Sequence, residues 1–151
     1  MRTVVEELVY RSCLSLDDRD FEAYLGLCAA DFRYTVKAYA PEIRREMVWL
    51  DHDRAGMELL FRNLPRHNSD PTPLARHATV YTVTFDAART QATVVSALQV
   101  FRTALDGGTT SLFAVGKMYD TVRLDEGTAL LAKRLIRLDT RQLGIGSHIP
   151  F

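Results

Sequence analysis

Residues 91–105, QATVVSALQVFRTAL, decide the fold because they have the pattern of a long β-strand with apolar side chains on both sides. A sheet with one face in water alternates apolar and polar residues along each strand. Here the apolar residues fall on both sides: Val94, Leu98 and Val100 on one, and Val95, Ala97 and Phe101 on the other. Both faces of the predicted sheet are therefore partly covered.

The same kind of pattern continues before and after this strand. Further strands are predicted at 77–86, 110–124 and 128–140, with Asp-containing turns at 86–89, 106–108 and 125–127. In the last strand the expected faces are Leu131 and Leu135 against Leu130, Ile136 and Leu138. The back half of the chain, 77–140, is therefore predicted to be a curved antiparallel sheet.

The front part, 1–64, is predicted to be mainly helical with one short strand. Helical spacing of apolar residues predicts helices over 3–16, 16–29 and 53–65. Asp17 or Asp18 is expected to cap the second helix, and the strand is predicted from the alternation in DFRYTVKAYA, residues 31–40. About three helices followed by a sheet make an α+β domain with the helices packed on one face.

The chain has 151 residues and is expected to form one domain, 1–151, that ends in an apolar tail, 141–151. Three helices cover only one face of a sheet, so the other face is a candidate subunit interface. Strand ends that curl under loops explain the same pattern equally well. The tail ends in Ile149, Pro150 and Phe151, and we expect such an apolar end to be docked on its own domain or on a partner.

Charge and composition exclude several classes of protein. Nineteen Lys and Arg balance nineteen Asp and Glu, which gives no reason to expect nucleic acid or an anionic membrane as a partner. No apolar run approaches the roughly 18 residues of a membrane helix, and Glu6 and Glu7 interrupt the start of the chain where a signal peptide is apolar. Cys13 and Cys28 are expected to be reduced and buried in a cytoplasmic protein.

The stretch WLDHDR, residues 49–54, places Asp51, His52 and Asp53 in a row. A metal site would need further ligands in a fixed geometry, and neighbouring side chains on a regular element diverge. We therefore favour the interpretation that Asp51 or Asp53 is the N-cap of a helix that starts near Arg54.

His77 is the candidate acid–base residue. With Asp31, Tyr24 or Tyr34 it could act on a ligand in a pocket between the helices and the sheet; a hydrogen-bonded structural histidine is the competing interpretation. A facial triad for iron from His67, Asp70 and His77 is a weak hypothesis, because the spacing is not diagnostic. The sequence contains no dinucleotide or P-loop motif, no nucleophile elbow and no cysteine pair with metal-type spacing.

Four segments resemble, in order and spacing, the small or beta subunits of Rieske-type ring-hydroxylating oxygenases. They are LDDRDFEAYLGLCAADFRYTV, DHDRAGMELLFRNL, RHATVYTV and VGKMYDTVRLDEGTALLAKRLIRLDT, which together span about residues 5–141. The wider fold is similar to the cone-shaped, cystatin-like family of nuclear transport factor 2, ketosteroid isomerase and scytalone dehydratase. The segments APEIRREMVWLDHDR and RHNSDPTPLARH look like the branch that acts on small sulfonates such as methanesulfonate, by monooxygenation.

The resemblance implies a non-catalytic structural subunit that carries no cofactor or metal. Such subunits trimerise through their sheets within an α3β3 complex, and the alpha subunit holds the Rieske [2Fe–2S] cluster and the mononuclear Fe(II). NAD(P)H supplies electrons through a reductase, often via a ferredoxin. The residues expected at the interfaces are Phe101, Leu135, Arg141, Ile149 and Phe151. A stand-alone dehydratase, isomerase or binding protein that uses His77 is the alternative function.

Overall fold

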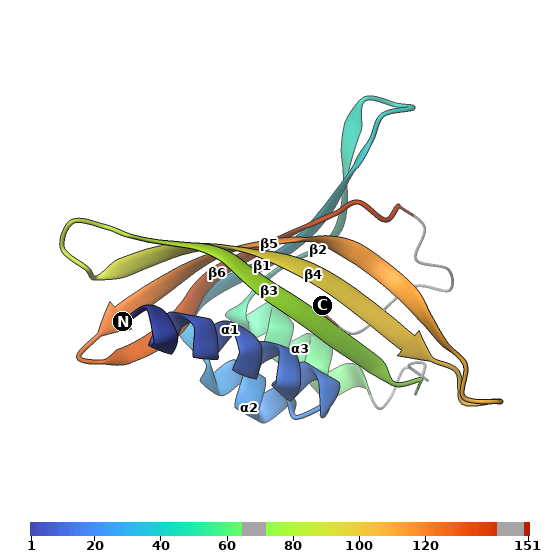
Figure 1. Cartoon of the computed structure of the whole chain (residues 1–151), viewed down its shortest axis with the longest axis horizontal. Coiled ribbons are helices and arrows are strands. Elements are labelled where there is room, and N and C mark those ends of the chain that lie inside the picture. The colour runs from blue at the N-terminus through green and yellow to red at the C-terminus, as the bar shows by residue number, and fades with distance from the viewer. Residues whose placement is uncertain (65–71, 142–149) are drawn as a thin grey trace.

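The computed structural model describes residues 1–64, 72–141 and 150–151. Within them, three helices lie against one face of a six-stranded sheet that curves over them (Figure 1). The elements are α1 (Arg2–Asp17), α2 (Phe21–Gly26), β1 (Cys28–Ala40), β2 (Arg45–Asp53), α3 (Arg54–Asn63), β3 (Leu74–Phe85), β4 (Gln91–Thr103), β5 (Thr110–Asp125) and β6 (Thr128–Leu138). The predicted α+β class, with helices on one face of the sheet, is confirmed.

The strand order is β2-β1-β6-β5-β4-β3, and every neighbouring pair is antiparallel except β1 and β6, which run parallel. The antiparallel sheet predicted for 77–140 is therefore confirmed in β3 to β6, and the parallel pairing involves β1, which lies outside that prediction. The chain crosses by way of α3 to the far edge and returns as the meander from β3 to β6. The last strand of that meander then lies beside β1 in the same direction, which local sequence patterns do not reveal.

The boundaries of the front half differ from the prediction at two places. The N-cap of α2 is Asp20, which accepts a hydrogen bond from the Ala23 N–H at 3.1 Å, rather than Asp17 or Asp18. Helix α2 ends at Gly26, so Cys28 opens β1 instead of lying within the helix predicted over 16–29. Strand β2, which the sequence did not predict, is mostly exposed and therefore lacks a strong period of two.

A β-bulge explains why the faces of the last strand were mispredicted. The register between β5 and β6 shifts between Thr121 and Val122, so that Thr121 pairs with Lys133 and Val122 with Leu131. The extra residue puts Leu131 on the buried side of the sheet, whereas Leu135 lies on the other side. Simple alternation had placed these two leucines on the same face.

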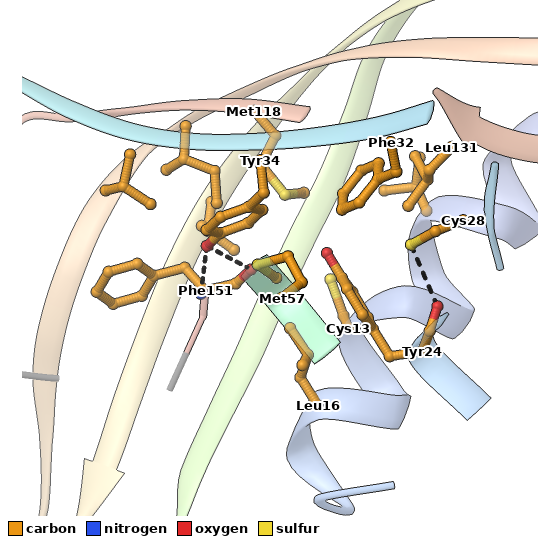
Figure 2. Packing of buried hydrophobic residues seen from close by; sticks show 14 of the residues in the cluster. Cys13, Leu16, Tyr24, Cys28, Phe32, Tyr34, Met57, Met118, Leu131 and Phe151 are labelled. Atoms are coloured by element: carbon orange, nitrogen blue, oxygen red, sulfur yellow. Dashed lines mark hydrogen bonds between the residues drawn. The ribbon is translucent and has the colours of Figure 1, made fainter. Parts of the chain in front are cut away.

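The core fills the space between the helices and the sheet. Buried side chains come from every helix and from the inner positions of the strands, including the predicted inner residues Val94, Leu98 and Val100 of β4. Figure 2 shows that Tyr24 of α2 and Tyr34 of β1 both point into this space, and Met57 of α3 belongs to the same core cluster. We call the helix-covered side of the sheet the inner face and the opposite side the outer face.

The hairpin formed by β1 and β2 extends away from the helical layer (Figure 1). Near its turn the hairpin is joined to β6 through Glu46 of β2, which is paired with both Lys37 of β1 and Arg137 of β6. None of the helices in the described ranges is long and apolar enough to cross a membrane.

Candidate functional site

The Asp51–His52–Asp53 triplet is the start of a helix. Asp53 is the N-cap of α3, and its carboxylate accepts a hydrogen bond from the Gly56 N–H at 2.8 Å. Asp51 does not cap the helix and forms an ion pair with Arg33 at 2.8 Å on the neighbouring strand. The expectation of an N-cap at this position is confirmed.

The structure keeps His77 apart from Asp31. His77 lies on the outer face of β3, where it is exposed and packs against Phe101 with ring centroids 4.9 Å apart. Asp31 lies on β1, which three other strands separate from β3, and roughly 4.8 Å per strand makes this a wide gap. Asp31 instead forms a bidentate ion pair with Arg123 at 2.9 and 3.0 Å, and those hydrogen bonds lower the pKa of its carboxyl group.

Tyr24 and Tyr34 lie on the inner side, and both are fully buried. They therefore cannot share a site with His77, which is on the other side of the sheet. Burial raises the pKa of each phenol well above its ordinary value, so both remain protonated. The Tyr24 hydroxyl has no hydrogen-bond partner among the described residues. The proposed acid–base constellation is thus not assembled in this chain.

A buried ion pair crosses the inner face, which sequence reasoning did not identify. Arg134 of β6 donates two hydrogen bonds to Asp120 of β5, both 2.8 Å, and a third to the Ser12 hydroxyl of α1 at 2.9 Å. The side chains of Arg134 and Asp120 are 1% and 0% exposed. Burial disfavours the charged guanidinium, but the Asp120 carboxylate outweighs that effect and raises the pKa of Arg134 above its ordinary range. A sequence signal existed, because strand alternation puts both charged residues in line with apolar residues of β5 and β6.

A second polar cluster lies where the chain's last described residues enter the core. Arg76 of β3 is held by Asp17 of α1, through Nη1 at 2.7 Å and through its backbone N–H at 3.1 Å. Its Nη2 donates to the Pro150 carbonyl at 2.6 Å. Phe151 follows with its ring 2% exposed. The apolar end of the chain is therefore docked on its own domain, one of the two outcomes expected from the sequence.

The outer face carries an apolar strip that neither the three helices nor Pro150 and Phe151 cover. The central row of paired residues runs across Val95, Tyr119, Leu135 and Thr35, and all but Thr35 are half-buried or exposed. Phe101 continues the strip on β4. Apolar side chains gathered on one sheet face, rather than scattered singly, are typical of a surface that contacts another protein.

Charged side chains, most of them in ion pairs, lie around this strip. The ion pairs on the outer face are Arg33 with Asp51, Arg123 with Asp31, and Lys37 and Arg137 with Glu46. Lys117 and Lys133 are exposed, and no ion pair joins them to any residue in the described part of the chain. An apolar strip bordered by charged groups has the composition of a protein–protein interface with a polar rim.

The structure places the residues expected at interfaces in different surroundings. Leu135 and Phe101 lie on the outer face, half-buried in this single chain. Arg141 is exposed and pairs with Glu42 of the hairpin. Phe151 is enclosed in the core of its own chain, so its side chain is not available to a partner in this conformation. Ile149 lies outside the described residues, and so do His67 and Asp70 of the suggested iron triad.

The described residues contain no group of three or more His, Cys, Asp or Glu side chains that could hold a metal ion. Cys13 and Cys28 are buried and free. Burial raises the pKa of the Cys28 thiol to about 12, so it stays protonated at neutral pH. The outer face is therefore the strongest candidate functional surface in the described part of the chain.

Comparison with known proteins identifies the family of the chain. The chain matches the family described as ring hydroxylating beta subunit over residues 11–144. It is 43% identical to the hydroxylase beta subunit of methanesulfonate monooxygenase from Methylosulfonomonas methylovora, over 97% of this chain and 84% of that protein.

Two solved structures from Novosphingobium aromaticivorans share the fold. A candidate beta subunit of an aromatic-ring-hydroxylating dioxygenase superposes with a TM-score of 0.81 at 20% identity, over 99% of this chain and 95% of that one. A nuclear transport factor 2-like protein with a cystatin-like fold superposes with a TM-score of 0.66 at 23% identity, over 93% and 83% of the two chains.

Proposed function

The chain belongs to the family of ring-hydroxylating beta subunits, and from this premise we propose that it serves its oxygenase as a structural subunit without an active site of its own. It is the small subunit of a multicomponent oxygenase. The observation that carries the structural role is the outer face, where Leu135 and Phe101 form part of an apolar strip that no helix of the described residues covers.

The proposed partners are further copies of this chain and the large alpha subunit of the oxygenase, in an α3β3 complex. Obligate interfaces of this kind bury roughly 2,000 Å² or more and are more apolar than the remaining surface, which fits the strip around Leu135 and Phe101. The Rieske [2Fe–2S] cluster and the mononuclear iron would be held by the alpha subunit and supply the oxygen chemistry. The described residues of this chain offer no ligand set for either group.

We further propose a cytoplasmic complex that receives electrons from a reductase, directly or through a ferredoxin, and in which this chain is a single cone-shaped domain. The proposed substrate class is small sulfonates, with monooxygenation as the reaction. This proposal is supported by the 43% identity to a methanesulfonate monooxygenase beta subunit. Substrate contacts are expected mainly in the alpha subunit.

A native mass measurement tests the assembly. The complex is purified through a tag on this chain from its own host, and its iron content is assayed on the same sample. A large hetero-oligomer with a heavier iron–sulfur partner is expected. An iron-free assembly of this chain alone would refute the oxygenase-subunit proposal.

Paired substitutions test the outer face. Leu135→Glu places a charge in the apolar strip and is expected to weaken the complex roughly tenfold or more. Leu59→Glu is the matched control, because Leu59 is 53% exposed on α3 at the helical side. Analytical ultracentrifugation at several protein concentrations compares how strongly the two variants assemble. Equal assembly of both variants would show that the strip is not an interface.

A further inference from the structure

Pro150 and Phe151 are held in the core by side chains rather than by a helix or strand. Three polar groups of their backbones each have a side-chain partner. Arg76 donates to the Pro150 carbonyl at 2.6 Å. The Phe151 N–H donates to the Tyr34 hydroxyl oxygen at 2.7 Å, and that hydroxyl donates to the Phe151 carbonyl oxygen at 3.4 Å. Recognition of backbone groups by buried side chains is how proteins bind a peptide ligand in a pocket.

The ring of Phe151 is also enclosed by the protein. It is 2% exposed, and its centroid lies 6.2 Å from that of Phe113 on β5. Figure 2 shows the Tyr34 hydroxyl directed at the Phe151 backbone, with the ring extending to the other side. The site therefore contacts an aromatic ring and the amide groups next to it at the same time.

The anchors of this site are fixed independently of Pro150 and Phe151. The Asp17 carboxylate accepts hydrogen bonds from both the side chain and the backbone of Arg76, whose side chain is only 1% exposed. Tyr34 sits in the middle of β1 and is fully buried. The Arg76 Nε–H is buried and has no partner among the described residues, which leaves one donor for a further polar group. A preorganised site of this kind keeps its shape when its occupant leaves.

We propose that Asp17, Arg76, Tyr34 and Phe113 form a binding site for an N-acyl aromatic amino acid unit, which the chain fills with its own Pro150–Phe151. The docked end acts as an intramolecular ligand, and its release opens a pocket for a small molecule of the same chemistry. This inference does not depend on the role of the chain in an oxygenase. It adds a ligand site on the inner side of the sheet, opposite the proposed interface.

Full-length Phe151→Ala tests the proposal by emptying the ring position. The probe is N-acetylphenylalaninamide, which supplies a ring, an acyl carbonyl and an amide N–H. Thermal unfolding is expected to show a lower midpoint for the variant than for the wild type. The probe should raise that midpoint with a dissociation constant on the order of 1 mM. The wild type, whose site is occupied, should not respond.

Two controls separate specific recognition from the filling of any cavity. Phe61→Ala removes a buried ring of the same size, stacked on Phe21 at 4.5 Å, away from Tyr34 and Arg76. The probe should not stabilise it. Adding Tyr34→Phe to Phe151→Ala should reduce the preference for the amide probe over toluene, because the Tyr34 hydrogen bonds are lost while Arg76 still donates to the acyl carbonyl.

If Phe151→Ala does not fold unaided, the same probe is added during refolding and the recovered yield is measured. Phe151→Leu, which retains most of the packing, is assayed in parallel. Probe-dependent recovery or stabilisation supports the proposal. An equal response of the Phe61→Ala control, or no response of either Phe151 variant at saturating probe, would overturn it.

Discussion

Replacement of Asp120 by Asn should destabilise the chain severely, because it leaves the Arg134 cation buried without a countercharge. The two residues share two hydrogen bonds of 2.8 Å and are at most 1% exposed. Asparagine has nearly the shape of aspartate, so the substitution changes charge and donor pattern with little change in volume. One of the two Arg134 donors would then face an amide group that cannot accept.

The expected loss follows from these contacts. Each hydrogen bond to a charged group contributes about 1.5–3 kcal/mol, and removal of one partner of a buried pair costs about 3–5 kcal/mol. A domain of this kind has a free energy of unfolding of about 5–15 kcal/mol. The Asp120→Asn variant should therefore lose about 3–5 kcal/mol, which corresponds to a fall in Tm of roughly 6–20 °C.

A double-mutant cycle in urea isolates the pair. The double variant Asp120→Leu with Arg134→Met replaces both charges by apolar groups, so it should cost less than either single substitution. The Ser12 hydroxyl, which also accepts a hydrogen bond from Arg134, would then lose that partner while keeping its own hydrogen bond to the Val9 carbonyl at 2.6 Å. The coupling free energy is the quantity to be measured.

The exposed pair Asp31–Arg123 is a matched control, since it is also bidentate, at 2.9 and 3.0 Å. Its side chains are 67% and 51% exposed, so water replaces the lost contacts and Asp31→Asn should leave the urea midpoint nearly unchanged. A loss below about 1 kcal/mol for Asp120→Asn, similar to the control, would refute the reasoning that a buried cation left without its countercharge is costly.

Three further predictions concern stability. Burial raises the pKa of Cys28 from 9.0 to about 12. The free energy of unfolding should therefore fall as the pH rises from 9 toward 12, by about 4 kcal/mol in full. Cys28→Ala should flatten the decline in urea midpoint between pH 9 and 11. Asp53→Ala removes the N-cap of α3 and should cost about 1 kcal/mol in urea unfolding. Gly116→Ala puts a Cβ 2.2 Å from the Arg137 carbonyl oxygen and should cost at least about 2 kcal/mol of unfolding free energy by calorimetry. Gly26→Ala is the control, because a Cβ there meets nothing within 4 Å and should leave the stability unchanged.

Several elements were predictable because their signals are local. The turn after β3 is an example: Asp86 accepts hydrogen bonds from the Thr90 and Gln91 backbones at 2.8 and 3.1 Å, as its side-chain chemistry predicts. The Asp53 cap and the long strands of the back half were predicted for the same reason. Strand β2 was missed because its exposed residues carry no alternating pattern.

The proposed acid–base site failed for the opposite reason. Whether His77 and Asp31 meet depends on strand order and on which face each residue occupies. The β-bulge in β6 changed the face of Leu131 in the same way, because one inserted residue reverses every side chain after it. Neither feature has a signature within a few residues of sequence.

The sequence by itself determined the helical front, the long strands, the turns between them and the family to which the chain belongs. These depend on the periodicity of apolar residues and on side chains that bond their own neighbours. Only the tertiary structure decided that Ser12 meets Arg134 across 122 positions and that Tyr34 meets Phe151 across 117. Such contacts arise from the order in which strands pair and from the space left between sheet and helices. Those are properties of the assembled layers rather than of any segment.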